Sequence, residues 1–395
     1  MITSGEGSPR IYTSQFWLLC TSSLLFFGSF NMIIPELPNF LTELGGAEYK
    51  GFIISLFTLT AMISRPFSGK MADRIGRVPV MMIGSTICFI SSLLYPILTT
   101  VSAFMMLRLM HGFSTGFTPT GQTAYLGDVI PFQRRGEAMG ILGTAGTLGM
   151  AGGPAIGGAI ANNFSLDVMF YCSALFAISS ILILISIQET VKDKHPVRFA
   201  VLKIHKKDLF EPRVLAPCIV MALCAYSFGA LLTVIPDFGE YVEIKNKGLL
   251  FTYFTVSSLL IRLVGGKASD WYGRQPVLKI STFFIAVAMV VIGFADSKGM
   301  LILGVSLLGF AQGATSPTLL AWASDLSDEN HKGRGVASLY IFMEFGIGMG
   351  AFWSGLMYGN DPQNFMLTFF ACALLSFIAF IYLLIKPRGV IREAA

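Results

Sequence analysis

Two ionisable residues stand inside long apolar stretches of the sequence. Arg108 begins the segment Arg-Leu-Met-His-Gly, and Glu344 lies within Phe-Met-Glu-Phe-Gly. A charge in such a setting is costly and marks a functional site by default, because it needs a partner or a water-filled cavity. A carboxyl group away from water favours its neutral form, so Glu344 could gain and lose a proton near neutral pH. We expect Glu344 to exchange protons with Arg108 as its partner. A Glu344 held permanently in a structural hydrogen-bond network is the alternative.

Three further residues are candidates for proton transfer. His111 could titrate near neutral pH, although a single histidine on a helix also serves as a neutral, hydrogen-bonded spacer. Glu36 and Asp237 each follow a proline near the end of an apolar stretch. We expect water to reach these two carboxylates and to lower the cost of their charge, which places them second to Glu344.

The composition excludes a water-soluble chain. Hydrophobic residues make up 54% of the 395 residues and charged residues 13%, about half of the roughly 25% found in soluble proteins. The net charge of +5 is not gathered on a soluble face, so no nucleic-acid partner is expected. The six cysteines lie in apolar runs without CxxC spacing and predict neither disulfides nor a metal site. The sequence indicates a bundle of helices in a lipid bilayer.

Twelve segments are long and apolar enough to cross a bilayer, which takes about 20 residues each. They divide into two sets of six, in residues 1–187 and 213–395, and residues 188–212 form a charged linker. We expect the linker to be either an amphipathic helix on the membrane surface or a flexible basic segment. The twelve expected spans are 16–36, 50–68, 78–96, 101–124, 136–160, 166–187, 213–237, 247–266, 276–295, 299–323, 334–357 and 363–386.

The basic residues predict the orientation. If the N-terminus is cytoplasmic, 23 of the 28 Lys and Arg lie in cytoplasmic loops or at cytoplasmic span ends, Arg65 and Arg77 among them. Lys50, Lys245 and two other lysines would lie outside. Because cytoplasmic loops carry an excess of Lys and Arg, both termini are expected in the cytoplasm, with the chain in the cytoplasmic membrane.

The two sets of spans are copies of each other. At an offset of 197 residues, eight of sixteen positions are identical between 65–80 and 262–277. The same offset relates Asp128 to Asp325. Two parallel copies of a six-helix unit predict a binding site at their interface, near the middle of the bilayer.

The repeated segment resembles the signature loop of the major facilitator superfamily, between its second and third spans. We expect Asp73 to accept hydrogen bonds from the N-terminus of a neighbouring helix. The resemblance implies that Arg77 pairs with Asp128 and that this loop holds the two halves in the outward-facing state. The gating residues implied in the two halves are Gly69, Asp73, Arg74, Gly76, Arg77, Asp128, Asp270, Gly273 and Arg274.

The fifth span matches the glycine pattern of that superfamily's drug:proton antiporters. Small residues at such spacing let a second helix approach closely, and the proline kinks the span. Arg108 also resembles the superfamily's fourth-span arginine, which is associated with proton transfer. The residues of the fifth-span pattern are Gly149, Gly153, Pro154, Gly157 and Gly158.

The resemblance implies a twelve-helix fold whose first, fourth, seventh and tenth spans line a central cavity. A lining of aromatic residues with few polar groups suits lipophilic, cationic or zwitterionic molecules better than sugars. Lipid-facing aromatic residues are the alternative reading of the same positions. The cavity residues expected are Asn31, Gln122, Tyr125, Tyr226, Gln312, Trp322, Phe30 and Phe117.

The expected function is proton-coupled export of lipophilic or amphipathic small molecules. The sequence has no phosphate-binding loop of the Gly-x4-Gly-Lys-Ser/Thr type, so ATP is not the direct energy source. It also lacks a catalytic constellation, a metal-ligand cluster and a dinucleotide fingerprint, so neither an enzyme nor a cofactor is expected. A monomer is expected from the resemblance. Sugar or metabolite efflux, uptake by symport, and a lipid or glycolipid flippase are the alternatives.

Overall fold

The computed structural model describes residues 12–131, 134–191, 210–327 and 332–385, and this part of the chain contains helices and turns but no strand. Twelve of its helices have 18 to 29 residues, and a short helix, α2 (Leu37–Glu43), extends the first of them. The twelve are α1 (Ser14–Ile33), α3 (Lys50–Ile75), α4 (Arg77–Leu94), α5 (Val101–Val129), α6 (Arg135–Asn163), α7 (Leu166–Ile185), α9 (Leu215–Tyr241), α10 (Gly248–Tyr272), α11 (Arg274–Gly293), α12 (Lys298–Leu326), α13 (Lys332–Tyr358) and α14 (Phe365–Ile385).

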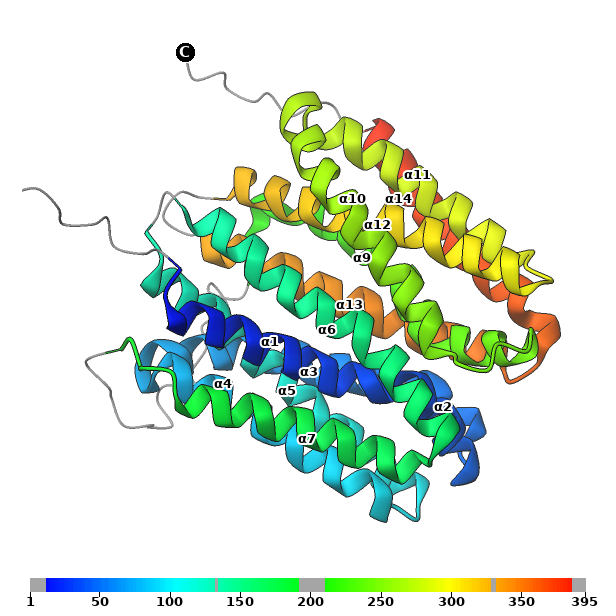
Figure 1. Ribbon diagram of the computed structural model, residues 1–395. Coiled ribbons are helices and arrows are strands. Elements are labelled where there is room, and N and C mark those ends of the chain that lie inside the picture. Colours follow the sequence, from blue (N-terminus) through cyan, green and yellow to red (C-terminus); the bar gives the residue numbers. More distant parts are fainter. Residues whose placement is uncertain (1–11, 132–133, 192–209, 328–331, 386–395) are drawn as a thin grey trace, which may run out of the picture.

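The helices form two bundles that lie side by side (Figure 1). The N-terminal half contains α1 to α7 and the C-terminal half α9 to α14, and the two halves repeat the same pairings: α1 packs on α6 as α9 packs on α13, and α3 packs on α5 as α10 packs on α12. The halves meet where α3 packs on α13 and α6 packs on α10. The expected all-helical fold of two related halves is confirmed.

Each expected span coincides with one long helix, and two helices run furthest beyond the expected ends. Helix α3 continues to Ile75 and α10 to Tyr272, where the expected spans end at 68 and 266. Hydropathy underestimates the length of both helices because their last two turns carry charged residues and glycine. As a result, Gly69, Asp73 and Arg74 belong to a helix and not to a loop.

The internal repeat extends to close helix contacts. A Cβ on Gly112 of α5 would lie 2.1 Å from the carbonyl oxygen of Phe57, and a Cβ on Gly309 of α12 would lie 2.2 Å from that of Phe254. Both pairs are related by the same offset of 197 residues. Glycine is required at these positions because any side chain would push the two helices apart.

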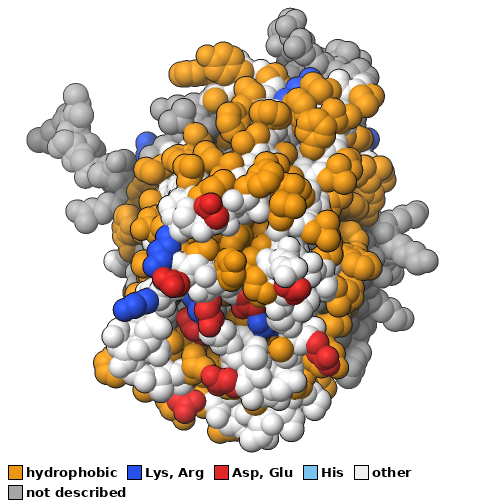
Figure 2. All heavy atoms as spheres, turned by 90° about the vertical axis from the view of Figure 1, so that its right-hand side faces the viewer, with side chains coloured by type: hydrophobic (Ala, Val, Ile, Leu, Met, Phe, Trp, Pro, Cys, Tyr) orange, Lys and Arg blue, Asp and Glu red, His pale blue; other side chains and the backbone are white. Residues whose placement is uncertain are grey.

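The bundle has two ends, which we call the terminal face and the opposite face. The terminal face carries the start of α1, the end of α14 and the α3–α4 and α10–α11 turns; it lies on the left in Figure 1. Figure 2 looks at the opposite face, where charged side chains of both signs gather in the lower half of the view. Among the described residues, nine helices are long and apolar enough to cross a membrane, so the chain is a multi-pass membrane protein. Residues 192–209 of the linker, where an amphipathic helix is one expectation, lie outside the described residues.

Candidate functional site

An ion pair between a half-buried arginine and a buried glutamate joins the two halves. Arg65 of α3 donates from Nη2 to Oε1 of Glu344 on α13 at 2.5 Å, and the two side chains are 17% and 8% exposed. The ring of Tyr340, one turn before Glu344, lies 5.1 Å from the guanidinium carbon of Arg65. Arg65 Nε has no hydrogen-bond partner among the described residues. The carboxylate is therefore the main group that compensates the charge of Arg65.

The expected pairing of Glu344 with Arg108 is wrong. Arg108 is 1% exposed and donates from Nε to the carbonyl oxygen of Ile53 at 2.7 Å and from Nη1 to the hydroxyl of Tyr95 at 3.1 Å. Its guanidinium carbon lies 4.6 Å from the ring centroid of Phe57. These contacts all lie within the N-terminal half, so Arg108 does not link the halves. The helix phase that decides this cannot be obtained from hydropathy.

His111 lies in the same polar group as Arg108. Its Nδ1 is 3.2 Å from the hydroxyl of Tyr95, which also accepts from Arg108. His111 is fully buried, and Nε2 has no partner among the residues that the structure describes. Tyr95 thus bridges the imidazole and the guanidinium, away from the interface where Glu344 lies.

We expected water to reach the carboxylates of Glu36 and Asp237, but the structure buries both residues. They are 6% and 8% exposed, because both lie where the two halves meet at the opposite face. Asp237 forms an ion pair with Lys50 of α3. Arg65 and Lys50 were both assigned to span ends by their charge alone, and each is a buried partner of an acid from the other half. Both cations belong to α3, a helix that packs against the other half. Knowledge of that packing would have indicated that Lys50 and Arg65 could pair with acids of the C-terminal half.

The α3–α4 turn contains the predicted arginine–carboxylate contacts. Arg77 donates from Nε to Oδ2 of Asp128 at 3.0 Å and from Nη1 to Asp73. Gly76 has a φ of +120°, a conformation that favours glycine, and this lets α4 begin directly after α3. The expectation that Asp73 caps a neighbouring helix is wrong. Glu189 does so, accepting from the backbone N–H of Arg77 at 3.0 Å and of Val78 at 3.1 Å.

The second half repeats these contacts at the α10–α11 turn. Arg274 donates from Nε to Oδ2 of Asp325 at 2.9 Å and from Nη1 to Asp270. Gly273 has a φ of +88°. Each cluster joins helices of its own half, so in this structure neither contact crosses between the halves.

The glycine pattern of α6 serves two interfaces. Gly149, Gly153 and Gly157 contact α1: a Cβ on each would lie 2.1 to 2.6 Å from a carbonyl oxygen of that helix. Pro154 and Gly158 face the other half. A Cβ on Gly158 would meet the side chain of Asn246, and Gly248 of α10 lies directly against the carbonyl oxygen of Pro154. The pattern therefore builds the N-terminal half and also brings it close to α10.

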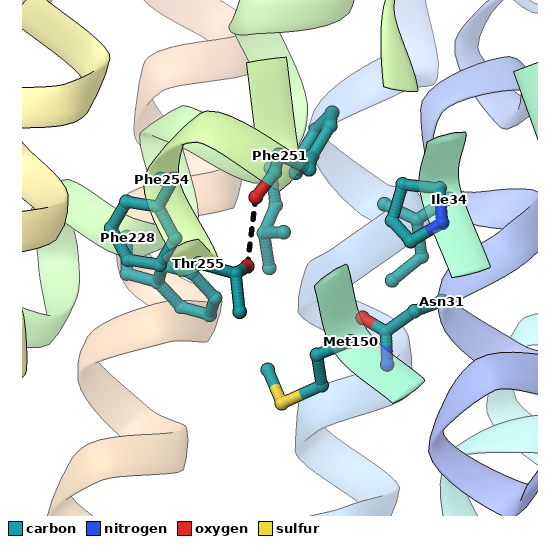
Figure 3. A pocket seen from close by; sticks show the side chains of 9 residues that line it. Asn31, Ile34, Met150, Phe228, Phe251, Phe254 and Thr255 are labelled. Carbon is teal, nitrogen blue, oxygen red and sulfur yellow. Dashed lines mark hydrogen bonds between the residues drawn. The ribbon is translucent and has the colours of Figure 1, made fainter. Parts of the chain in front are cut away.

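A small cavity lies between the halves (Figure 3). Its volume is about 10 Å³, room for about one water molecule. Asn31 and Met150 lie on one side in Figure 3, and Phe228, Phe254 and Thr255 on the other. Asn31 and Thr255 donate to carbonyl oxygens of their own helices. The residues that line the cavity are Asn31, Ile34, Met150, Pro154, Phe228, Leu232, Phe251, Phe254 and Thr255.

Of the eight expected cavity residues, Asn31 is the one that lines this cavity. Gln312 donates to the carbonyl oxygen of Cys224 at 2.8 Å. Phe30 stacks on Phe57, and Tyr226 lines a shallow apolar groove formed by α9, α13 and α14. The other four are buried side chains that do not line the cavity: Gln122, Tyr125, Phe117 and Trp322. The lining residues that the sequence did not predict come largely from α6 and α10, two helices that were not expected to line the cavity.

Comparisons with known proteins agree with the fold. The sequence model of the Major Facilitator Superfamily matches residues 19–245 and 242–394. The chain is 27% identical over 334 residues to the multi-drug resistance efflux pump PmrA of Streptococcus pneumoniae serotype 4, covering 80% of this chain and 82% of PmrA. It is 24% identical over 278 residues to multidrug resistance protein 1 of Bacillus subtilis, covering 67% and 69% of the two chains.

A solved structure of a D-xylose-proton symporter superposes with a TM-score of 0.76 at 16% identity, covering 93% of this chain and 96% of that one. At this identity the likeness concerns the fold alone. Together with the match to the family model over nearly the whole length, it shows that this chain belongs to the Major Facilitator Superfamily.

Proposed function

We propose that the chain is a proton-coupled exporter of lipophilic or amphipathic small molecules in the cytoplasmic membrane. Its similarity to efflux pumps supports export. The excess of Lys and Arg at the terminal face supports a cytoplasmic location of that face and of both termini. Each half supplies one partner of the Arg65–Glu344 pair, so a single copy completes the site, and we propose a monomer.

The observation that carries the proton coupling is the Arg65–Glu344 pair. Arg65 is the 16th residue of α3 and Glu344 lies midway along α13, so both are well inside the membrane. Removing one partner of a buried ion pair leaves the other charge uncompensated. A proton on Glu344 neutralises the carboxylate and so leaves the charge of Arg65 uncompensated in the same way. Protonation therefore favours separation of α3 from α13, which is the motion that opens the bundle.

The coupling follows from competition between two states of Glu344. When the carboxylate is ionised, Arg65 holds it and the halves stay in contact at this level. When the carboxyl group is protonated, the guanidinium needs more water than reaches its 17% exposed side chain, and separation of the halves admits that water. A proton gained on one side of the membrane and lost on the other thus drives the alternation between the two open states. Substrate binding that favours ionised Glu344 produces antiport.

Arg77 and Arg274 support the same cycle from the terminal face. Each arginine ties the end of one helix to a carboxylate of another helix of its half. We propose that these contacts keep each half rigid, so that the halves move as units. Their partners are partly exposed, and an exposed ion pair contributes at most about 1 kcal/mol, so each contact adds only a small part of the rigidity of its half.

The cavity lining supports a lipophilic substrate. Phe228, Phe251 and Phe254 face Met150 across it, and the polar groups of Asn31 and Thr255 are already bonded within their own helices. A sugar would leave its hydroxyl groups unpaired there. Metabolite efflux, symport and lipid flipping remain as the alternatives that transport measurements must separate.

The test uses the purified chain in liposomes with an imposed pH gradient and fluorescent lipophilic cations as probes. We expect transport against the direction of proton flow, lost in Glu344→Gln and retained in Glu137→Gln. Glu137 is the matched control because its carboxylate forms an exposed ion pair with Arg134. Flux in the same direction as the protons would indicate symport, and flux independent of the gradient would overturn the proposal. Movement of labelled lipid in the same vesicles would favour the flippase.

A further inference from the structure

A second buried ion pair joins the halves at the opposite face. Lys50, the first residue of α3, binds Oδ2 of Asp237 on α9, and the two side chains are 10% and 7% exposed. Lys50 and Arg65 are 15 residues apart on one helix, which is about 22 Å along its axis. Helix α3 therefore carries a cation at two levels, and the C-terminal half supplies an acid at each level.

The surroundings of Asp237 contain other charged and titratable groups. From α13, the phenol of Tyr358 lies beside the carboxylate, and the amino group of Lys50 is 6.0 Å from its ring centroid. From α9 itself, Glu240 binds Lys247 at 2.6 Å. Glu36 of the segment between α1 and α2 lies near these two residues. Glu240 is thus already neutralised by Lys247, and Lys50 is the cation that compensates Asp237.

Asp237 is incompletely bonded within this group. Its Oδ1 is buried and accepts no hydrogen bond from the described residues, so the ion pair with Lys50 is its principal stabilising contact. A proton on Asp237 would remove that contact and leave the buried ammonium group of Lys50 near one remaining carboxylate of the described residues, that of Glu240, which Lys247 already binds. Lys50 would then gain by moving to water, which requires the opposite face to open.

Three other hydrogen bonds that close this face involve no titratable group. Thr252 of α10 donates to the carbonyl oxygen of Ala151 at 2.7 Å, and Asn246 donates to that of Ala155 at 3.1 Å. Asn360 donates to the carbonyl oxygen of Ala47 at 2.8 Å. Hydroxyl and amide donors keep their hydrogen bonds at any pH between 5 and 8. Among the described residues, Lys50–Asp237 is the ion pair that joins the halves at this face and that a proton can break. The carboxylates of Glu36 and Glu240 also lie where the halves meet, near Lys247.

We propose that Lys50 and Asp237 form a proton-operated latch that holds the opposite face closed and releases it when Asp237 is protonated. This inference rests on the proposed function for its orientation, which places the opposite face outside the cell. In that orientation the latch senses protons outside the cell. The outside face then opens when the proton concentration outside is high enough to protonate Asp237. Arg65–Glu344 lies deeper, so a proton entering from outside reaches the Lys50–Asp237 latch first.

The test measures the distance between the halves at the opposite face with spin labels. Thr42→Cys on α2 and Leu249→Cys on α10 place one label on each half at exposed positions. The chain without these two cysteines gives the background, since the native cysteines are buried except for the partly buried Cys172. The full chain is reconstituted and examined over a series of pH values from neutral to acid.

We expect the separated population to grow as the pH falls, by at most about tenfold in its ratio to the closed one per pH unit, the limit for a single titrating group. Asp237→Asn should be separated at every pH. The charge exchange Lys50→Asp with Asp237→Lys should restore the short distance near neutral pH. Glu243→Gln is the matched control, because Glu243 forms an exposed ion pair with Lys298 at 3.6 Å on the same face, and it should behave as the unaltered chain does.

Several results would overturn the latch. One is a short distance at every pH in the chain with no change other than the labels, a measurement that needs no further variant to fold. Another is an equal response in Asp237→Asn and Glu243→Gln. The distance measurement uses neither substrate nor gradient, so it stands apart from the transport test. If Glu344→Gln abolishes transport but keeps the pH response of the opposite face, the two pairs act separately as proposed. If Glu344→Gln alone abolishes that response, the latch is wrong.

Discussion

The ion pair between Arg65 and Glu344 makes a quantitative prediction about stability. Replacing Glu344 by Gln keeps the shape of the side chain but leaves the guanidinium without a carboxylate. Breaking a buried pair in this way costs about 3–5 kcal/mol. Because Arg65 is 17% exposed and water can reach part of it, we expect a loss near the lower end, about 3 kcal/mol. Arg65→Gln should cost a similar amount by leaving Glu344 unpaired.

The double variant separates the pair from the individual side chains. With both residues changed to Gln, no uncompensated charge remains, and the variant should be more stable than the sum of the single changes predicts by about 1–3 kcal/mol. The assay is thermal unfolding in detergent, followed by loss of the monodisperse peak in gel filtration. The pair Arg134 and Glu137, which is exposed, provides the control cycle, with an expected coupling below about 1 kcal/mol.

Additive losses in the Arg65–Glu344 cycle would refute the reasoning. They would mean that the two side chains do not stabilise each other, and that the contact in the structure does not restrain the halves. A coupling equal to that of the exposed control pair would lead to the same conclusion, since burial is what makes the interior pair strong.

Two other predictions concern packing and pH. Gly112→Ala should lower stability by about 1–3 kcal/mol, because its Cβ would lie 2.1 Å from the carbonyl oxygen of Phe57; Gly127→Ala, which meets no atom within 4 Å, should be neutral or stabilising in the same thermal assay. The hydrogen bond from Arg334 lowers the pKa of Glu211 in the folded chain. The ionised Glu211 carboxylate therefore adds stability above its unfolded pKa of about 4.3. This contribution is lost as the pH falls through the lower pKa of the folded state. Thermal unfolding measured from pH 7 down to pH 3 should therefore show a smaller acid loss in Glu211→Gln than in the unaltered chain; equal slopes would contradict the assignment.

Much of the fold was predictable from the sequence. Each of the twelve expected spans overlaps one of the twelve long helices, because a run of about 20 apolar residues is the signal of a helix that crosses a bilayer. The resemblance implied the Arg77–Asp128 pair, and the repeat at 197 residues relates these residues to Arg274 and Asp325, which form the same contact. These features depend on spacing along the chain, which a sequence contains directly.

The partners of the buried charges were not predictable in the same way. Which residue faces Glu344 depends on the rotation of α13 and α3 about their axes, and hydropathy does not determine that rotation when a helix is buried on several sides. Arg65 was assigned to the cytoplasmic end of its span because the charged residues after it suggested that the helix had ended. Helix α3 in fact continues for ten residues beyond Arg65, about 15 Å, which places this arginine in the interior.

The most direct test of the account is the proton released when substrate binds. Purified protein in a weakly buffered detergent solution receives a transported cation, and the pH change is recorded with a soluble indicator. The account predicts proton release by the unaltered chain and by Glu137→Gln, and none by Glu344→Gln, although that variant still binds the cation. Equal proton release by Glu344→Gln would show that another group carries the proton, and would contradict the central role given to the Arg65–Glu344 pair.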